Sequence, residues 1–208
     1  MPPYATTASL LLATIAQQQA AIAELSASPL GILSGPAIRR VLRTMPGPID
    51  VIALDFRKLH EWNELLGYNV ASEFLARFCQ TRSRARRRGD RRALDVRGQW
   101  GGDEIVIACA AGSGQGLLMR LVWALDRLSA QLTAGQRAAI AERTGGLIDG
   151  FAAVFVLVER SAQPLADASR AVDECGVLKR GRQTGERATS GAAGTIIGTI
   201  QPSKENGS

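Results

Sequence analysis

The chain has 208 residues and a net charge of +6 at pH 7, a length that allows one domain with a sizeable core and an accessory segment. The apolar fraction is an ordinary 46%, no apolar run approaches the roughly 20 residues of a membrane span, and no basic leader precedes the apolar residues 9–16. The widely spaced cysteines (Cys79, Cys109, Cys175) fit neither a disulfide framework nor a zinc knuckle and favour a cytoplasmic protein. The sole histidine, His60, argues against a histidine-rich metal site or a Ser-His-Asp triad.

The N-terminal segment, residues 1–27, is predicted to be a helix, because residues 5–27 contain neither Gly nor Pro. A heptad can be laid on it, with the core positions Ala8, Ile15 and Ile22 in one row and Leu11, Gln18 and Leu25 in the other. Two interpretations are open. One is a short coiled coil, which would make a homodimer, and the other is an amphipathic helix packed on its own domain.

The rest of the chain alternates strand-like and helix-like segments. Strands are predicted at 48–56, 94–100, 103–110 and 150–159, and helices at 36–45, 60–88 with a break at Gly67, 114–132 and 164–179. This order predicts an α+β fold with a palm-type (ferredoxin-like) antiparallel sheet and helices on one face, preceded by the N-terminal helix. The main domain would span residues 28–182, and a Gly/Ser-rich tail, 183–208, contains TIIGTI as a candidate last strand.

Three acidic residues fall where two predicted strands end. Asp55 ends a long apolar strand, and Asp103 and Glu104 follow Gly101-Gly102 at a hairpin turn. In a palm-type sheet the first strand lies beside this hairpin, so the carboxylates can converge on Mg²⁺, which takes carboxylate and phosphate oxygens. The two glycines would let a nucleotide lie directly on the backbone. The alternative is an ordinary Gly-Gly turn with solvated acids.

An arginine-rich block, RSRARRRGDRRALDVR, occupies residues 82–97. Such a block attracts phosphate, either in a nucleotide or in nucleic acid, and a plain solvated face is the alternative. No aromatic-rich platform accompanies it, so binding to single-stranded nucleic acid is not expected.

These motifs together resemble the GGDEF family, nucleotidyl cyclases that join two GTP into cyclic di-GMP. The stretch WGGDEIVI is similar to the family signature, and the resemblance covers about residues 28–182. SPLGILSG resembles a weakened form of the family's opening motif, Asp-x-Leu-Thr-Gly-Leu-x-Asn. LDFRKLHEWNELLGYNVAS resembles Asp-x-Asp-x-Phe-Lys-x-Ile-Asn-Asp-x-x-Gly-His-x-x-Gly-Asp.

The resemblance implies a metal site and a catalytic site for Mg²⁺ (or Mn²⁺). Asp55 matches the family's metal-binding Asp, and Asp103 matches its second metal ligand. Glu104 matches the acid that completes the metal site or handles the attacking 3′ hydroxyl.

The resemblance also implies a substrate site. Asn63 matches the residue that contacts guanine, and Phe56, Gly101 and Gly102 would lie against the nucleotide. Ser72 stands where the family usually carries an Asp that faces guanine, as in a hybrid, promiscuous branch that makes cyclic GMP-AMP from ATP and GTP.

The implied phosphate site departs from the family spacing, whereas the implied product site keeps it. LKRGR offers Lys179 and Arg182 for phosphate, one residue closer together than the family spacing. Arg92 and Asp95 form an Arg-x-x-Asp pair with five residues between it and Gly101, which is the family's inhibitory-site spacing for cyclic di-GMP.

Three further positions depart from the family pattern in the strand motif and the signature. Gln99 stands where an Arg is common, and Ile105 replaces the signature Phe. Arg57 reverses the charge of a second family acid.

The expected function is that of a cyclic dinucleotide synthase, most simply a diguanylate cyclase acting as a homodimer on GTP, with no membrane partner. Two alternatives are open. One is a hybrid enzyme that also uses ATP, and the other is a non-catalytic relative that binds cyclic dinucleotide.

Overall fold

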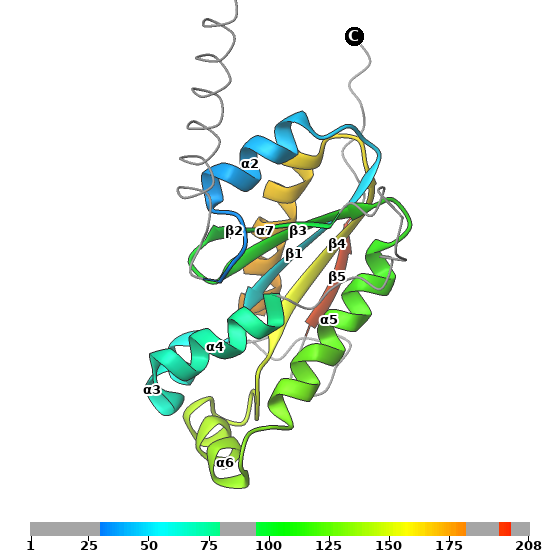
Figure 1. Cartoon of the computed structure of the whole chain (residues 1–208). Coiled ribbons are helices and arrows are strands. Elements are labelled where there is room, and N and C mark those ends of the chain that lie inside the picture. Colours follow the sequence, from blue (N-terminus) through cyan, green and yellow to red (C-terminus); the bar gives the residue numbers. More distant parts are fainter. Residues whose placement is uncertain (1–29, 80–94, 182–195, 201–208) are drawn as a thin grey trace, which may run out of the picture.

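The computed structural model describes residues 30–79, 95–181 and 196–200 (Figure 1). The predicted N-terminal helix and its coiled coil, together with Arg92 and Arg182, lie outside the described residues. None of the helices within the described residues is long and apolar enough to cross a membrane.

Five strands form one sheet in the spatial order β2-β3-β1-β4-β5 (Figure 1). The strands are β1 (Ile49–Phe56), β2 (Asp95–Gly101), β3 (Glu104–Ala110), β4 (Ala153–Ser161) and β5 (Ile196–Ile200). Neighbouring strands are antiparallel except β4 and β5, which are parallel. The predicted α+β class with a palm-type sheet is confirmed, and the candidate last strand in the tail is β5.

Six helices lie within the described residues, and five of them follow the predicted pattern. They are α2 (Gly35–Thr44), α3 (Leu59–Leu66), α4 (Tyr68–Cys79), α5 (Gly114–Ser129), α6 (Ala134–Arg143) and α7 (Pro164–Gly181). The predicted break at Gly67 separates α3 from α4, and its φ of 84° is one that L side chains rarely adopt. Helix α6 was not predicted; it is a short polar helix that begins with a capping box between Thr133 and Gln136.

The helices cover both faces of the sheet, so the prediction that they lie on one face was wrong. Strand β1 is buried along its whole length, and alternate residues enter two separate cores. Leu54 lies in the core beneath α5, and Ala53 lies in the core that α2 and α7 complete. A strand with apolar side chains on both faces needs cover on both, which an all-apolar run such as IDVIALDF already indicates.

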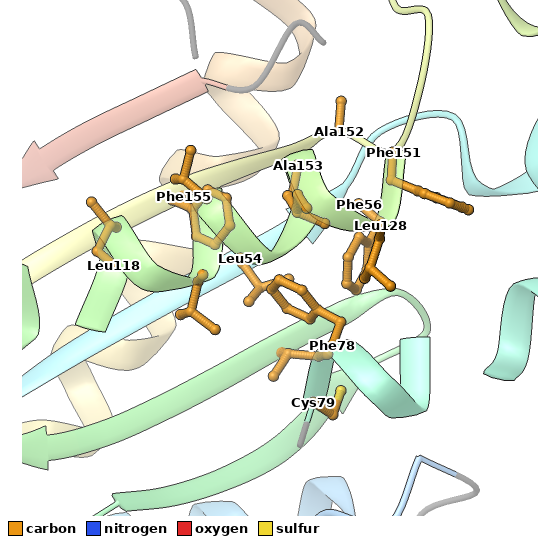
Figure 2. Packing of buried hydrophobic residues seen from close by; sticks show 14 of the residues in the cluster. Leu54, Phe56, Phe78, Cys79, Leu118, Leu128, Phe151, Ala152, Ala153 and Phe155 are labelled. Carbon is orange, nitrogen blue, oxygen red and sulfur yellow. The ribbon is translucent and has the colours of Figure 1, made fainter. Parts of the chain in front are cut away.

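Aromatic packing fixes the C-terminal end of β1 against α3 and α4. The ring of Phe56 meets that of Phe78 edge-to-face with centroids 5.4 Å apart (Figure 2). It meets the ring of Trp62 in the same way at 6.1 Å. Trp62 in turn lies edge-on to Phe151 at 4.5 Å. Edge-to-face pairs contribute about 0.5–1.5 kcal/mol each beyond their burial, so this cluster holds the residues after β1 in place.

A buried carboxylate ties β1 to its neighbours. Asp50 is fully buried, and its two oxygens accept hydrogen bonds from Gly114 N at 2.7 Å and Arg160 N at 2.8 Å. Gly114 N lies in the first turn of α5, where unpaired backbone N–H groups favour an anion. Asp50 therefore sets the position of α5 and β4 relative to β1.

Candidate functional site

The end of β1 and the β2–β3 hairpin lie side by side. In the β1–β3 pairing Asp55 is opposite Glu104, which places all three predicted acids at one edge of the sheet. The turn is closed by Gln99, whose Nε2 donates to the Gly102 carbonyl at 2.6 Å. Gly102 has a φ of 43°, in the left-handed region that glycine tolerates best.

Lys179, in the last turn of α7, reaches across to these acids. Its Nζ donates to Asp55 Oδ1 at 2.6 Å, to Asp103 Oδ2 at 3.3 Å and to the carbonyl oxygen of Phe56 at 3.0 Å. The Asp55 side chain is 8% exposed, whereas those of Lys179 and Asp103 are 28% and 33% exposed. The pair with Asp55 is therefore the more buried of the two ion pairs.

Burial and neighbouring charge shift the protonation of this cluster. Burial raises the pKa of Asp55, and the charge of Asp103 raises it further, although the hydrogen bond from Lys179 opposes both. Burial alone would lower the pKa of Lys179, but its hydrogen bond to Asp55 and the charges of both aspartates outweigh burial and raise it. The ammonium therefore remains charged, and it compensates for carboxylates that lie close together.

Glu104 lies at the rim of the cluster, over the hairpin turn. A Cβ on Gly101 would lie 3.1 Å from Glu104 Oε2, so the absence of a side chain at this position leaves room for the carboxylate. Burial raises the pKa of Glu104, and so do the charges of Asp55 and Asp103. A carboxyl group with a raised pKa is suited to accept a proton near neutral pH.

The oxygens around Lys179 also suit a divalent cation. Asp55, Asp103 and the Phe56 carbonyl already converge on one positive charge, the Lys179 ammonium. Mg²⁺ typically takes one or two carboxylates together with water and substrate phosphates. No group of three or more His, Cys, Asp or Glu side chains in the described ranges is arranged to hold a metal ion. Two carboxylates and one carbonyl therefore fit a metal that is completed by substrate.

A cavity of about 200 Å³ opens beside the acids. Five predicted site residues line it: Phe56, Asn63, Ser72, Gly102 and Asp103. Apolar side chains line much of the remaining wall, and the polar groups of Asn63 and Ser72 come from the adjacent helices α3 and α4. This combination is typical of a small-molecule site, where apolar walls bury the ligand and a few polar groups orient it.

Six of the residues that line the cavity were not predicted as site residues. They are Leu30, Leu59, Tyr68, Leu75, Gln99 and Ile105. Tyr68 is the most informative, since its side chain is 65% exposed and carries a flat ring at the cavity. A signal for it was available, because Tyr68 precedes Ser72 by four residues and shares its helix face.

The remaining predicted residues are placed as follows. Lys179 contacts Asp55 and Asp103, and Gly101 and Glu104 lie at the β2–β3 hairpin. Asp95 begins β2 opposite Cys109, and its predicted partner Arg92 is outside the described ranges, as is Arg182.

The fold resembles solved structures of GGDEF domains. The diguanylate cyclase SiaD of Pseudomonas aeruginosa, solved with its activator SiaC, aligns with a TM-score of 0.57 at 16% identity, over 95% of this chain and 70% of that chain. The coiled coil and GGDEF domain of DgcB from Caulobacter crescentus, solved with c-di-GMP, gives a TM-score of 0.58 at 11% identity over 93% and 96% of the two chains. A microbial GGDEF domain solved with cyclic di-GMP gives 0.52 at 18% identity, over 83% and 99%.

Sequence comparison alone reaches no such result, because neither a protein-family model nor a curated protein sequence matches the chain. The structural similarity is nevertheless consistent over most of the chain. The protein has the fold of GGDEF domains, as its sequence motifs predicted.

Proposed function

We propose that the protein is a cyclic dinucleotide synthase of the diguanylate cyclase type, which makes cyclic di-GMP from two GTP. One observation carries the proposal. The carboxylates of Asp55 and Asp103 and the Phe56 carbonyl converge on the Lys179 ammonium. Asp103 also lines the cavity that contains Asn63 and Ser72. A triphosphate site and a base site would then be adjacent, as a nucleotidyl transfer requires.

In the proposed reaction Asn63 and Ser72 hold the base, and the ring of Tyr68 offers an apolar face beside it. Asp55, Asp103 and the Phe56 carbonyl hold Mg²⁺ (or Mn²⁺), which when bound would stabilise charge on the transferring phosphate. Glu104 accepts the proton of the attacking 3′ hydroxyl. That oxygen bonds to the α-phosphorus of the second nucleotide, and pyrophosphate leaves. The 3′ hydroxyl of the second nucleotide then attacks the α-phosphorus of the first, and a second pyrophosphate leaves as the ring closes.

The proposal includes a second copy of the chain, because each site would bind one nucleotide and two must react. A homodimer would place two triphosphates face to face. Arg92 and Asp95 would bind cyclic di-GMP at a separate inhibitory site, as their spacing from Gly101 indicates. Lys179 and Arg182 would contact phosphate when the triphosphate is bound.

A non-catalytic protein that binds cyclic dinucleotide is the second candidate. The contact that favours it is the Lys179 ammonium, which already neutralises Asp55 and Asp103. A protein of this kind would retain the fold and bind cyclic di-GMP, and the acids would serve stability rather than metal binding.

The test is to incubate the purified protein with Mg²⁺ and GTP, ATP or both, and to identify products by mass. Formation of cyclic di-GMP that is lost in Asp103→Asn supports the synthase. Binding of cyclic di-GMP without any product, at protein concentrations that allow dimers, supports the non-catalytic candidate.

A further inference from the structure

Three oxygen acceptors saturate the Lys179 ammonium. An ammonium group has three N–H donors, and three oxygens lie within hydrogen-bonding distance: Asp55 Oδ1, the Phe56 carbonyl and Asp103 Oδ2. These are the same three groups that fit a divalent cation. A charge of +1 already held among them repels a second cation and occupies the lone pairs that it needs.

The packing of α7 against β4 places Lys179 beside these three oxygens. Cys175, one helical turn earlier, is buried and directs its Sγ toward the Val154 carbonyl at 3.8 Å. Val154 pairs with Asp55 across β4 and β1. Since residues four apart share a helix face, the position of Cys175 brings Lys179 over the end of β1.

The Lys179 side chain can nevertheless move away from these three oxygens. Lys179 is 28% exposed, lies two residues before the end of α7, and contacts Asp103, which lines the cavity. Its four-carbon stem is flexible, and an ammonium binds phosphate as readily as carboxylate. A triphosphate beside Asp103 would therefore offer it other oxygens.

We propose that Lys179 is a resident counter-cation that competes with the divalent metal in the free protein, and that a nucleoside triphosphate releases it. Metal and triphosphate then bind with positive coupling. The triphosphate draws the Lys179 ammonium away from the carboxylates, which favours the metal, and the metal in turn displaces Lys179, which favours its contact with phosphate. The triphosphate part rests on the proposed function, whereas the competition with metal stands on the three contacts alone.

The experiment measures Mn²⁺ binding to the nucleotide-free protein by electron paramagnetic resonance and calorimetry. Lys179→Met should bind Mn²⁺ at least tenfold more tightly than wild type, which corresponds to about 1.4 kcal/mol. Arg180→Met removes the same charge from the next position of α7, where the side chain is exposed, and should leave the Mn²⁺ affinity within twofold of wild type. Adding Asp103→Asn to Lys179→Met should abolish the gain.

A thermal measurement covers the case in which Lys179→Met is too unstable to purify. Lys179→Gln removes the charge but keeps an N–H donor group on the side chain. It should show the same gain in Mn²⁺ affinity, together with a melting temperature that Mn²⁺ raises more than in wild type. Equal Mn²⁺ affinities for wild type and both Lys179 variants would overturn the proposal.

Product assays separate this inference from the proposed function. If the Lys179 variants gain Mn²⁺ affinity but the wild type converts no nucleotide, the competition holds and the synthase assignment fails. If the wild type makes cyclic dinucleotide but its Mn²⁺ affinity is unchanged by loss of Lys179, the synthase assignment holds and the competition is refuted.

Discussion

Lys179 Nζ lies 2.6 Å from Asp55 Oδ1, so the last turn of α7 neutralises an acid 124 residues away at the end of β1. A carboxylate that is only 8% exposed needs such a partner, because burying an unpaired charge is costly. The proposed competition would give the site two states, one closed by the Lys179 ammonium and one that holds a metal with its triphosphate.

The first prediction concerns the start of α5. A Cβ added to Gly114 would lie 2.8 Å from Asp50 Cβ and 2.8 Å from Leu157 Cδ1, so Gly114→Ala should lower the free energy of unfolding by about 1–3 kcal/mol. Gly116→Ala, in the same helix turn, meets nothing closer than 3.8 Å and should be neutral or stabilising by up to about 1 kcal/mol. Urea unfolding of both variants checks this, and equal effects would contradict the role given to Asp50.

The second prediction is a pH dependence of stability. Burial raises the pKa of Cys79 to about 12 from 9.0, although the charge of Arg97 opposes the shift. Between these values the folded state keeps a proton that the unfolded state loses, so stability falls as pH rises above 9. The Cys79 share of this loss should be about 1.4 kcal/mol between pH 8 and pH 10.

Urea unfolding at pH 8, 9 and 10 measures this loss, with Cys79→Ala as the comparison. The variant should be less stable at pH 8, because a buried side chain is truncated, but its stability should decline less steeply with pH. Parallel pH profiles for the two proteins would show that the Cys79 thiol does not resist ionisation.

The third prediction concerns base choice. Ser72 lines the cavity, and a hydroxyl there replaces a carboxylate that would accept two guanine donors. With equal GTP and ATP we expect some cyclic GMP-AMP beside cyclic di-GMP, and Ser72→Asp should reduce the mixed product about tenfold, since hydrogen bonds to charged groups are worth about 1.5–3 kcal/mol against roughly 1 for neutral ones.

The control for this prediction is Asn69→Asp, which adds the same charge at an exposed position on α4. The ratio of the two products by mass is the readout. If wild type makes only cyclic di-GMP from the mixture, Ser72 does not determine base choice, and the protein is a diguanylate cyclase that is specific for GTP.

The fourth prediction concerns the arginine block. If Arg92 and Asp95 bind product, Arg92→Ala should relieve inhibition by cyclic di-GMP and weaken its binding at least tenfold in calorimetry, because a lost Arg–phosphate pair is strong and directional. Initial rates should change little. Arg86→Ala, six residues earlier in the same block, should leave inhibition intact. Equal effects of the two variants would make the motif a coincidence of composition.

Sequence patterns predicted the sheet and the positions of the acids, because both depend on local order. The apolar run before Asp55 and the Gly-Gly turn before Asp103 are each readable within about ten residues. The packing of helices on both faces of the sheet was not predicted, although a strand with apolar side chains on both faces, such as β1, already requires it. Helix α6 was missed because its polar sequence has a weak period.

Lys179 shows what the sequence could not predict. The sequence offered Lys179 only as a phosphate contact, one residue closer to Arg182 than the family spacing, because its contacts with Asp55 and Asp103 depend on how α7 packs against β4. A pairing across 124 residues leaves no local pattern. Tyr68 is different, because its position one turn before Ser72 was sufficient to place it at the cavity.

The most direct test compares the amount of cyclic di-GMP, identified by its mass, that wild type and Asp103→Asn form from GTP and Mg²⁺. Asp103 is one third exposed, so the variant should fold, with a circular dichroism spectrum like that of Asp149→Asn at an exposed control position. Loss of its charge removes one of two carboxylates from the cation site, and turnover should fall at least 100-fold, the order seen when one electrostatic group is removed from an active site. Cyclic di-GMP from wild type and almost none from Asp103→Asn is the result we predict, and near wild-type product from the variant would contradict the metal site.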